Sequence, residues 1–127
     1  MEHVAILGAS NNPSRYAYKA QIQLIEQGHI VYPVSLHEEE ILGLKSYHSL
    51  LEIDHNIDTV TVYINPTHLK QVDNHLIELK PKRVIFNPGS ESTEVMNHLK
   101  EEGIFVQSAC TLVLLSIQQF EARGRAQ

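Results

Sequence analysis

Five short apolar or β-branched runs recur along the chain and alternate with helical patterns of apolar residues. Runs of this kind form strands buried on both faces, and strands that alternate with helices pair in parallel through right-handed crossovers. The alternation predicts an α/β fold, a doubly wound parallel sheet of five strands in three α/β/α layers. The runs are Val4–Leu7, Ile30–Val34, Thr59–Ile64, Arg83–Phe86 and a shorter one that begins at Gly103.

The segments between these runs show helical spacing of apolar residues. Gly28 and Gly103 end two of the predicted helices, and Pro81 ends a third. Residues 36–58 lack clear periodicity and predict a loop with one helical turn around Ser49–Ile53. We expect one domain over residues 1–120 and a disordered tail at 121–127. The predicted helices are Tyr16–Gln27, Thr67–Leu79, Ser92–Glu102 and a short last helix within Thr111–Phe120.

The charge of the chain argues against two classes of partner. Fifteen acidic residues against ten basic ones give a net charge of -5. Grooves for nucleic acid and surfaces for anionic membranes usually carry a basic excess, so neither partner is expected. Any anion that the protein binds must therefore be held locally, by backbone amides and one or two well-placed cations.

The cysteine content and the apolar runs indicate a cytoplasmic protein. Cys110 is the single cysteine of the sequence, so no internal disulfide can form. The stretch from Met1 to Ser10 lacks the basic flank and long apolar core of a signal peptide. The longest apolar stretches reach about six residues, against the roughly 20 that a bilayer span needs. We expect a reducing compartment in which Cys110 stays a thiol.

Three Asn-Pro pairs follow predicted strands and indicate where a ligand would lie. Asn12-Pro13, Asn65-Pro66 and Asn87-Pro88 all fall at the carboxyl ends of strands, the usual ligand side of such a sheet. Asparagine also caps helices and proline suits the first helical position, and for Asn65-Pro66 alone capping is the favoured interpretation. Together with the small residues that follow Val4–Leu7, the pairs predict a ligand crevice.

The first predicted loop keeps only part of the dinucleotide-binding pattern G-x-G-x-x-G. Gly8 occupies its first position, but Ser10 and Pro13 stand at the second and third glycine positions. The second predicted strand is followed by no acidic residue until Glu38, so a ribose has no obvious carboxylate partner. Ser10 can still hydrogen-bond a phosphate, and the amino end of the following helix favours an anion. Ordinary NAD use is therefore disfavoured.

Several motifs occur in an order that matches a known family. V-x-x-x-G-A-S-x-x-P-x-R-Y starts at Val4, and G-H-x-V-Y-P-V starts at Gly28. I-x-G-x-K-x-Y starts at Ile41, T-V-T-V-Y-x-N-P at Thr59 and F-N-P-G at Phe86. These motifs resemble those of small single-domain CoA-binding proteins, which are similar to the CoA-binding domain of the succinyl-CoA synthetase α subunit and of ADP-forming acyl-CoA synthetases.

The resemblance implies a Rossmann-like fold and a site for CoA or acyl-CoA. The pyrophosphate of the ADP part would lie over the first loop, the adenine near the end of the second strand, and the pantetheine arm near two later loops. Arg15 suits the phosphate by its two-pronged geometry, and its place in the first helical turn, against the helix dipole, also indicates an anion. The residues implied are Gly8, Ala9, Ser10, Asn12, Pro13, Arg15, Tyr16, Pro33, Val34, Ser35, His37, Lys45, Asn65 and Asn87.

The chain departs from the family pattern after the second predicted strand. Ser35-Leu36-His37 stands where relatives typically carry Asn-Pro-Lys, whose lysine would meet the 3′-phosphate of CoA. His37 and Lys45 are the candidates to replace it. Selectivity for CoA over ADP or other nucleotides therefore stays open.

No catalytic or metal-binding residue is predicted. The eight histidines show no recurring ligand spacing, and Cys110 is best interpreted as a small buried thiol. The CoA ligases that the chain resembles need a phosphohistidine and an ATP-binding domain, which 127 residues do not accommodate. We expect a carrier, sensor or accessory module whose protein partner is unknown. The alternatives are a small NAD(P)- or nucleotide-dependent enzyme and a protein-interaction module with a vestigial pocket.

Overall fold

The computed structural model describes residues 1–121 and confirms the predicted α/β fold. Its strands are β1 (His3–Leu7), β2 (Ile30–Val34), β3 (Glu40–Ile41), β4 (Leu44–Lys45), β5 (Thr59–Val62), β6 (Arg83–Phe86) and β7 (Phe105–Ser108). The helices are α1 (Tyr16–Glu26), α2 (Pro66–Gln71), α3 (Asp73–Leu79), α4 (Thr93–Glu101) and α5 (Thr111–Ser116), with a 3-10 turn η1 at Leu50–Glu52.

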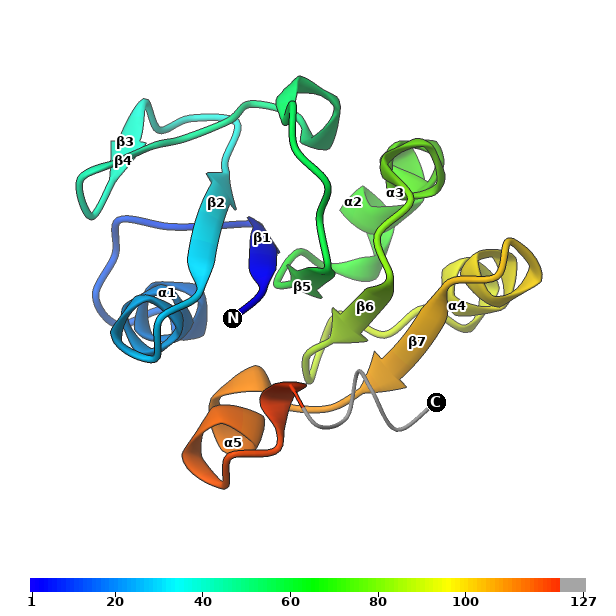
Figure 1. Cartoon of the computed structure of the whole chain (residues 1–127). Coiled ribbons are helices and arrows are strands. Elements are labelled where there is room, and N and C mark those ends of the chain that lie inside the picture. Colours follow the sequence, from blue (N-terminus) through cyan, green and yellow to red (C-terminus); the bar gives the residue numbers. More distant parts are fainter. Residues whose placement is uncertain (122–127) are drawn as a thin grey trace.

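The main sheet has five parallel strands in the order β2-β1-β5-β6-β7. The chain runs outward from β1 to β2 and then returns to build the sheet on the other side of β1. Helices cover both faces of this sheet, as Figure 1 shows, which gives the three layers that the sequence predicts. Because all five strands are parallel, the loops after β1, β5 and β6 emerge at one edge.

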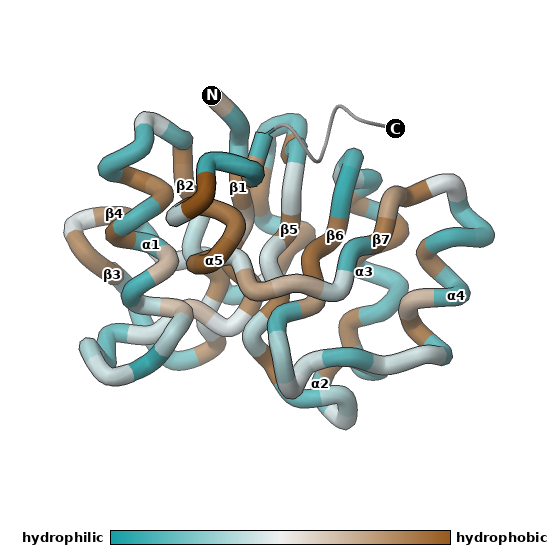
Figure 2. The backbone as a smooth tube through the Cα atoms, turned by 90° about the horizontal axis from the view of Figure 1, so that it is seen from below, coloured by the Kyte–Doolittle hydropathy of each residue, from teal (hydrophilic) through white to brown (hydrophobic). Residues whose placement is uncertain are grey.

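Alternate residues of each strand supply the two apolar layers. In β1, Val4 and Ile6 pack with α1 and α5, whereas Ala5 and Leu7 pack with α2, α3 and α4. Burial on both faces explains why the strands are continuous apolar runs. In Figure 2 the strands β2 and β6 and the helix α5 carry much of the hydrophobic colour.

The single helix predicted over Thr67–Leu79 is wrong in one respect, because the structure has two helices there. The chain leaves helical geometry at Val72, whose φ is -116° and ψ is 11°. Leu69 and Leu76 are nevertheless both fully buried in the same apolar layer. Apolar spacing reports only which side of a segment faces the core, so it does not reveal a break that keeps both leucines inward.

The segment predicted as a loop over residues 36–58 contains a small hairpin. β3 and β4 pair antiparallel around Leu42 and Gly43, whose φ angles are 51° and 80°. Ile41 is fully buried, and the side chain of Gln21 in α1 donates to its carbonyl oxygen at 3.1 Å. Strands of two residues are too short to show a period-two pattern, which is why the sequence does not reveal them.

The remaining predicted elements agree with the structure apart from their ends. The last strand of the sheet starts at Phe105 rather than Gly103, because Gly103 has a φ of 83° and closes α4. α5 ends at Ser116, and η1 confirms the helical turn predicted around Ser49–Ile53. The tail predicted at 121–127 lies outside the described residues except for Glu121, whose carboxylate pairs with the amino group of Met1.

Candidate functional site

A cavity of about 260 Å³ opens at the carboxyl end of the sheet, beside the point where the strand order turns back. This is the place where open parallel sheets bind ligands, and the sequence predicts a crevice there. The cavity walls come from the loops after β1, β5 and β6 and from the start of α1. The lining residues are Gly8, Ser10, Arg15, Tyr16, Ala17, Tyr63, Ile64, Asn65, Pro88, Gly89 and Ser90.

Gly8 brings the β1–α1 loop against the β5–α2 loop. Its φ is +96°, and a Cβ there would lie 2.8 Å from Cγ2 of Ile64 and 3.1 Å from the carbonyl carbon of Tyr63. A side chain at this position would be both strained and crowded. The N–H groups of Gly8 and Ala9 donate to the carbonyl oxygen of Val34 at 3.1 and 3.0 Å. These two amides therefore fix the loop on β2 and do not contribute donors to a ligand.

The amino end of α1 carries no side-chain cap. Arg15 occupies the N-cap position in an extended conformation, and the first turn contains no acidic residue. By contrast, Asn65 caps α2 and Ser92 caps α4 through their side-chain oxygens. Within residues 1–121 no hydrogen bond or ion pair engages the exposed guanidinium of Arg15. Uncapped N–H groups, the helix dipole and a cation thus meet at one wall of the cavity.

Asn87 lies beneath the site and holds three elements together. It is 3 % exposed, and its Nδ2 donates to Oγ1 of Thr61 at 2.7 Å and to the carbonyl oxygen of Val62 at 2.9 Å. Its Oδ1 accepts the N–H of Thr111 at 2.8 Å. The amide therefore ties β6 to β5 and to the start of α5 and has no free polar atom for a ligand.

The other two Asn-Pro pairs serve two further roles. Oδ1 of Asn65 accepts the N–H of His68 at 2.9 Å, which confirms the predicted capping, and Asn65 also lines the cavity. Oδ1 of Asn12 accepts the N–H and the hydroxyl of Ser14 at 3.0 and 2.8 Å, which closes a turn before α1. Asn12 and the exposed Pro13 shape the loop without lining the cavity.

Tyr63 lines the cavity but is not among the site residues predicted from the sequence. Burial raises the pKa of its hydroxyl to about 12, although the neighbouring hydroxyls of Thr61 and Thr111 partly oppose the shift. Tyr63 therefore stays neutral over the physiological pH range and offers no base. Five other lining residues were not among the predicted site residues either: Ala17, Ile64, Pro88, Gly89 and Ser90. Each lies within three positions of a predicted one, because the cavity wall continues along the same loops.

The end of β2 forms a separate, open surface next to the cavity. Pro33 and Val34 are buried in the strand, and Ser35 is half-buried. His37 and Lys45 are exposed, and Nζ of Lys45 lies 5.0 Å from the centre of the Tyr47 ring. The predicted site residues therefore do not form one cluster: some lie at the end of β2, and Ala9, Asn12, Pro13 and Asn87 support the loops without lining the cavity. Those in the cavity wall are Gly8, Ser10, Arg15, Tyr16 and Asn65.

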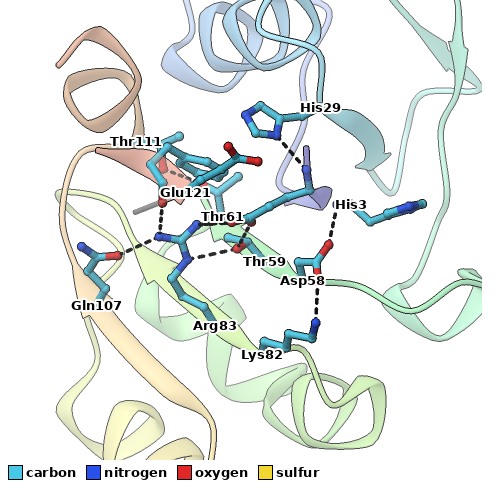
Figure 3. Close-up of polar contacts among 12 residues, drawn as sticks. His3, His29, Asp58, Thr59, Thr61, Lys82, Arg83, Gln107, Thr111 and Glu121 are labelled. Atoms are coloured by element: carbon cyan, nitrogen blue, oxygen red, sulfur yellow. Dashed lines mark hydrogen bonds and ion pairs between the residues drawn. The ribbon is translucent and has the colours of Figure 1, made fainter. Parts of the chain in front are cut away.

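A cluster of polar contacts centred on the buried Arg83 lies at the amino end of the sheet (Figure 3). Arg83 is 1 % exposed and donates to Oγ1 of Thr59 at 3.0 Å and to the carbonyl oxygen of Phe120 at 2.8 Å. It also donates to Oε1 of Gln107 at 3.3 Å and pairs with the carboxylate of Glu2 at 3.3 Å. These contacts use the guanidinium to join the chain ends to β5, β6 and β7.

Burial at this end of the sheet also acts on the pKa values of two neighbouring side chains, His29 and Asp58. Burial lowers the pKa of His29, whose Nδ1 accepts the N–H of Glu2 at 3.0 Å. Burial would raise the pKa of Asp58, but the N–H of His3 and the ammonium of Lys82 outweigh it and hold that pKa below its ordinary value. A shallow hollow of about 470 Å³ lies beside η1 and the end of α3.

Residues 1–121 contain neither a cluster of metal ligands nor a helix that could span a membrane. No group of three histidine, cysteine, aspartate or glutamate side chains among them is placed to hold a metal ion. None of the helices in this part of the chain has the length and apolar character needed to cross a membrane.

The fold and the cavity define a class of protein: a parallel α/β domain with a cavity where its strand order turns back, walled in part by an uncapped helix start and an arginine. The chain belongs to the CoA-binding domain family, since the family model described as "CoA binding domain" matches residues 2–116. This match confirms the resemblance that the sequence motifs carry.

Two curated relatives share the sequence over different parts of their length. The chain is 39% identical over 82 residues to acetate–CoA ligase [ADP-forming] II subunit alpha of Pyrococcus furiosus, covering 64% of the chain and 17% of that subunit. It is 29% identical over 102 residues to YneT of Bacillus subtilis, covering 80% of the chain and 76% of that protein. The chain thus spans a small part of the ligase subunit and most of YneT.

Solved structures of similar length share the whole fold. One crystal structure of an uncharacterized protein has a TM-score of 0.90 and 42% identity, covering 94% of this chain and 98% of that one. Cell-free ID.343 from Thermus thermophilus has a TM-score of 0.85 and 32% identity, covering 94% and 90%. A dinucleotide-forming acetyl-coenzyme A synthetase from Candidatus Korarchaeum cryptofilum shares the fold at 20% identity, over 25% of its own chain.

Proposed function

We propose that the chain binds CoA or an acyl-CoA through the ADP moiety at the carboxyl ends of its strands, as a non-catalytic carrier, sensor or accessory module. The observation that carries the proposal is the uncapped amino end of α1, with the exposed Arg15 beside it, opening into the cavity. Backbone N–H groups and an arginine at one wall are a chemistry suited to a pyrophosphate.

Ser10 supplies a further donor for the pyrophosphate in this proposal. Its Oγ accepts the N–H of Asn12 at 3.0 Å, so its own O–H stays available to donate. The donors toward the phosphates are therefore Ser10, Arg15 and the first turn of α1. Gly8 and Ala9 act by fixing the loop, since Val34 accepts both of their N–H groups.

The size of the cavity means that it takes only part of the ligand. Its volume of about 260 Å³ lies below the roughly 300–1,000 Å³ of pockets that enclose a whole drug-sized molecule. The pantetheine arm would run past Asn65 and Gly89 in the cavity. The adenine would lie on the open surface at the end of β2, beside Pro33, Val34 and Ser35.

The composition of the cavity wall supports a binding role without chemistry. The lining contains no histidine, aspartate, glutamate or cysteine, and the phenol of Tyr63 is held neutral. A general acid or base matched to neutral pH is thus missing from the wall itself. We place this role in the cytoplasm, where Cys110, a free thiol in the described structure, would stay reduced.

Isothermal titration calorimetry with CoA, acetyl-CoA, ADP, NAD and NADP tests the proposal. Arg15→Ala is expected to weaken CoA binding by about tenfold, the value of one charge-assisted contact. Lys19→Ala is the matched control, because it removes the same charge one turn further along α1, outside the cavity wall. Preference for NAD over CoA would contradict the proposal and favour a nucleotide-dependent enzyme. Absence of binding to all five would favour an interaction module.

A further inference from the structure

The ribose end of the proposed ligand lies beside the carboxyl end of β2. In open parallel sheets that bind nucleotides, the side chains after this strand decide which ribose substituents are accepted. A carboxylate there accepts hydrogen bonds from ribose hydroxyls, whereas a cation accommodates a phosphate on the ribose. In this chain the residues in question are those of the segment between β2 and β3, residues 35–39.

Glu38 is held at the junction between this segment and the β1–α1 loop. Nδ2 of Asn11 donates to Oε1 of Glu38 at 2.8 Å and to the carbonyl oxygen of Glu40 at 2.9 Å. Glu38 is half-buried, and the hydrogen bond from Asn11 ties its carboxylate to the loop that carries the proposed phosphate donors. The bond to Asn11 uses one carboxylate oxygen and leaves Oε2 to accept from a ribose hydroxyl.

The basic residues near this edge have acidic residues as neighbours in sequence, register or contact. Lys45 stands opposite Glu40 in the register of β3 and β4, and its Nζ lies 5.0 Å from the centre of the Tyr47 ring. Nε2 of His48 lies 3.2 Å from the carboxylate of Glu39. The exposed His37, the remaining candidate, directly precedes Glu38. A phosphate at this edge would therefore lie among carboxylates as well as these cations, and Glu38 is the carboxylate that a hydrogen bond ties to the β1–α1 loop.

We infer that the site discriminates against a phosphate on the adenosine ribose, with Glu38 as the specificity-determining residue, so that dephospho-CoA binds more tightly than CoA. The inference rests on the proposed function, because it presumes that the ADP part lies over the β1–α1 loop. Its physical basis is repulsion between the fixed carboxylate and a phosphate that carries about 1.5 to 2 negative charges at neutral pH.

Calorimetry of the full chain with CoA and dephospho-CoA, side by side, tests this inference. The wild-type protein is expected to bind dephospho-CoA about threefold to tenfold more tightly, the range for like charges several ångströms apart near a protein surface. Glu38→Gln keeps an oxygen for Asn11 and removes the charge, so it should strengthen CoA binding and bring the ratio of the two affinities near one. Glu39→Gln is the matched control, and it should leave the ratio unchanged.

The outcomes separate this inference from the proposed function. Equal affinities for the two ligands, tighter binding of CoA, or a ratio that Glu38→Gln does not move would each overturn the role of Glu38 while leaving CoA binding in place. Failure of both ligands to bind the wild-type chain would instead overturn the proposed function, and this inference with it.

Discussion

An arginine lies at each end of the sheet, and the two side chains differ in burial and in their contacts. At the amino end Arg83 is 1 % exposed, and its guanidinium contacts two side-chain oxygens, a carbonyl oxygen and the carboxylate of Glu2. At the carboxyl end Arg15 is exposed, and no interaction with residues 1–121 engages its guanidinium. The same side chain therefore closes the fold at one end and is available to a ligand at the other.

The comparison extends to the side chains that support each end. Arg83 itself supports the amino end, whereas the buried Asn87 supports the carboxyl end from beneath and binds Thr61, Val62 and Thr111. A rigid base of neutral hydrogen bonds leaves the charges and the helix N–H groups above it free to bind a ligand. Stability and binding are thus expected to depend on different residues at the two ends, which can be tested by pairs of matched substitutions.

The largest difference is expected between Arg83→Met and Arg15→Met. Removing Arg83 takes the ion-pair partner from the half-buried Glu2, which keeps the hydrogen bond from the Thr59 hydroxyl, and it also removes the donor from the buried oxygens that the guanidinium contacts. The substitution should lower the free energy of unfolding by about 3–5 kcal/mol. Arg15→Met removes an exposed side chain and should change it by less than about 0.5 kcal/mol. Urea unfolding followed by circular dichroism measures both. The comparison breaks down if Arg83→Met unfolds within about 1 kcal/mol of the wild type.

Gly8→Ala and Gly28→Ala compare two positive-φ glycines at opposite ends of α1. Both have φ near +90°, but a Cβ at Gly28 meets nothing within 4 Å, whereas one at Gly8 meets Ile64 at 2.8 Å. Backbone strain alone should cost about 1–2 kcal/mol at Gly28. Crowding adds to it at Gly8, for a total of about 2–4 kcal/mol. Equal losses in thermal unfolding would show that the loops after β1 and β5 can separate without cost.

The sequence predicts the sheet well because its strands are buried on both faces and local composition reflects that burial. It misses β3 and β4, whose two residues each are anchored by tertiary contacts such as the bond from Gln21 to Ile41. It also misses the break at Val72, because Leu69 and Leu76 keep their inward spacing across it.

In the candidate site, too, local sequence patterns predict some residues, whereas the roles of others depend on tertiary contacts. Gly8, Arg15 and Asn65 could be predicted because strand ends and helix starts have local sequence patterns. The three Asn-Pro pairs look alike in the sequence but have different roles: Asn12 closes a turn, Asn65 caps a helix and Asn87 belongs to a buried network. These roles depend on what each loop packs against. Glu38 stands in the sequence as the first acid after the second strand, but its bond to Asn11 joins residues 27 positions apart and is not visible in any local pattern.

Asn87→Ala and Asn65→Ala test whether the buried network supports the carboxyl end. The first removes an amide that makes three hydrogen bonds inside the protein and should cost about 2–3 kcal/mol of unfolding free energy. The second removes a helix cap at the surface and should cost about 1 kcal/mol. Chemical denaturation gives both values. A loss at Asn65 as large as that at Asn87 would mean that the cap, and not the buried network, supports the loops.

The smallest expected effect is a difference in pH dependence between His29, buried at the amino end, and His98, half-buried on α4. Burial lowers the pKa of His29 from its ordinary 6.5, so its contribution to stability is present above that pH and is lost as the pH falls through the folded value. The hydrogen bond to Asp73 at 2.8 Å raises the pKa of His98. Its contribution is present below 6.5 and is lost as the pH rises through the folded value.

Unfolding measured from pH 5 to 8.5 separates the two histidines. The stability difference between wild type and His29→Asn, whose Oδ1 replaces the Nδ1 acceptor, should shrink toward acid pH. The difference between wild type and Asp73→Asn should grow toward acid pH. Opposite slopes would show that burial at the amino end disfavours protonation of His29, whereas Asp73 favours protonation of His98 on α4. Parallel slopes would mean that His29 is hydrated, and that the amino end is not the closed end of the sheet.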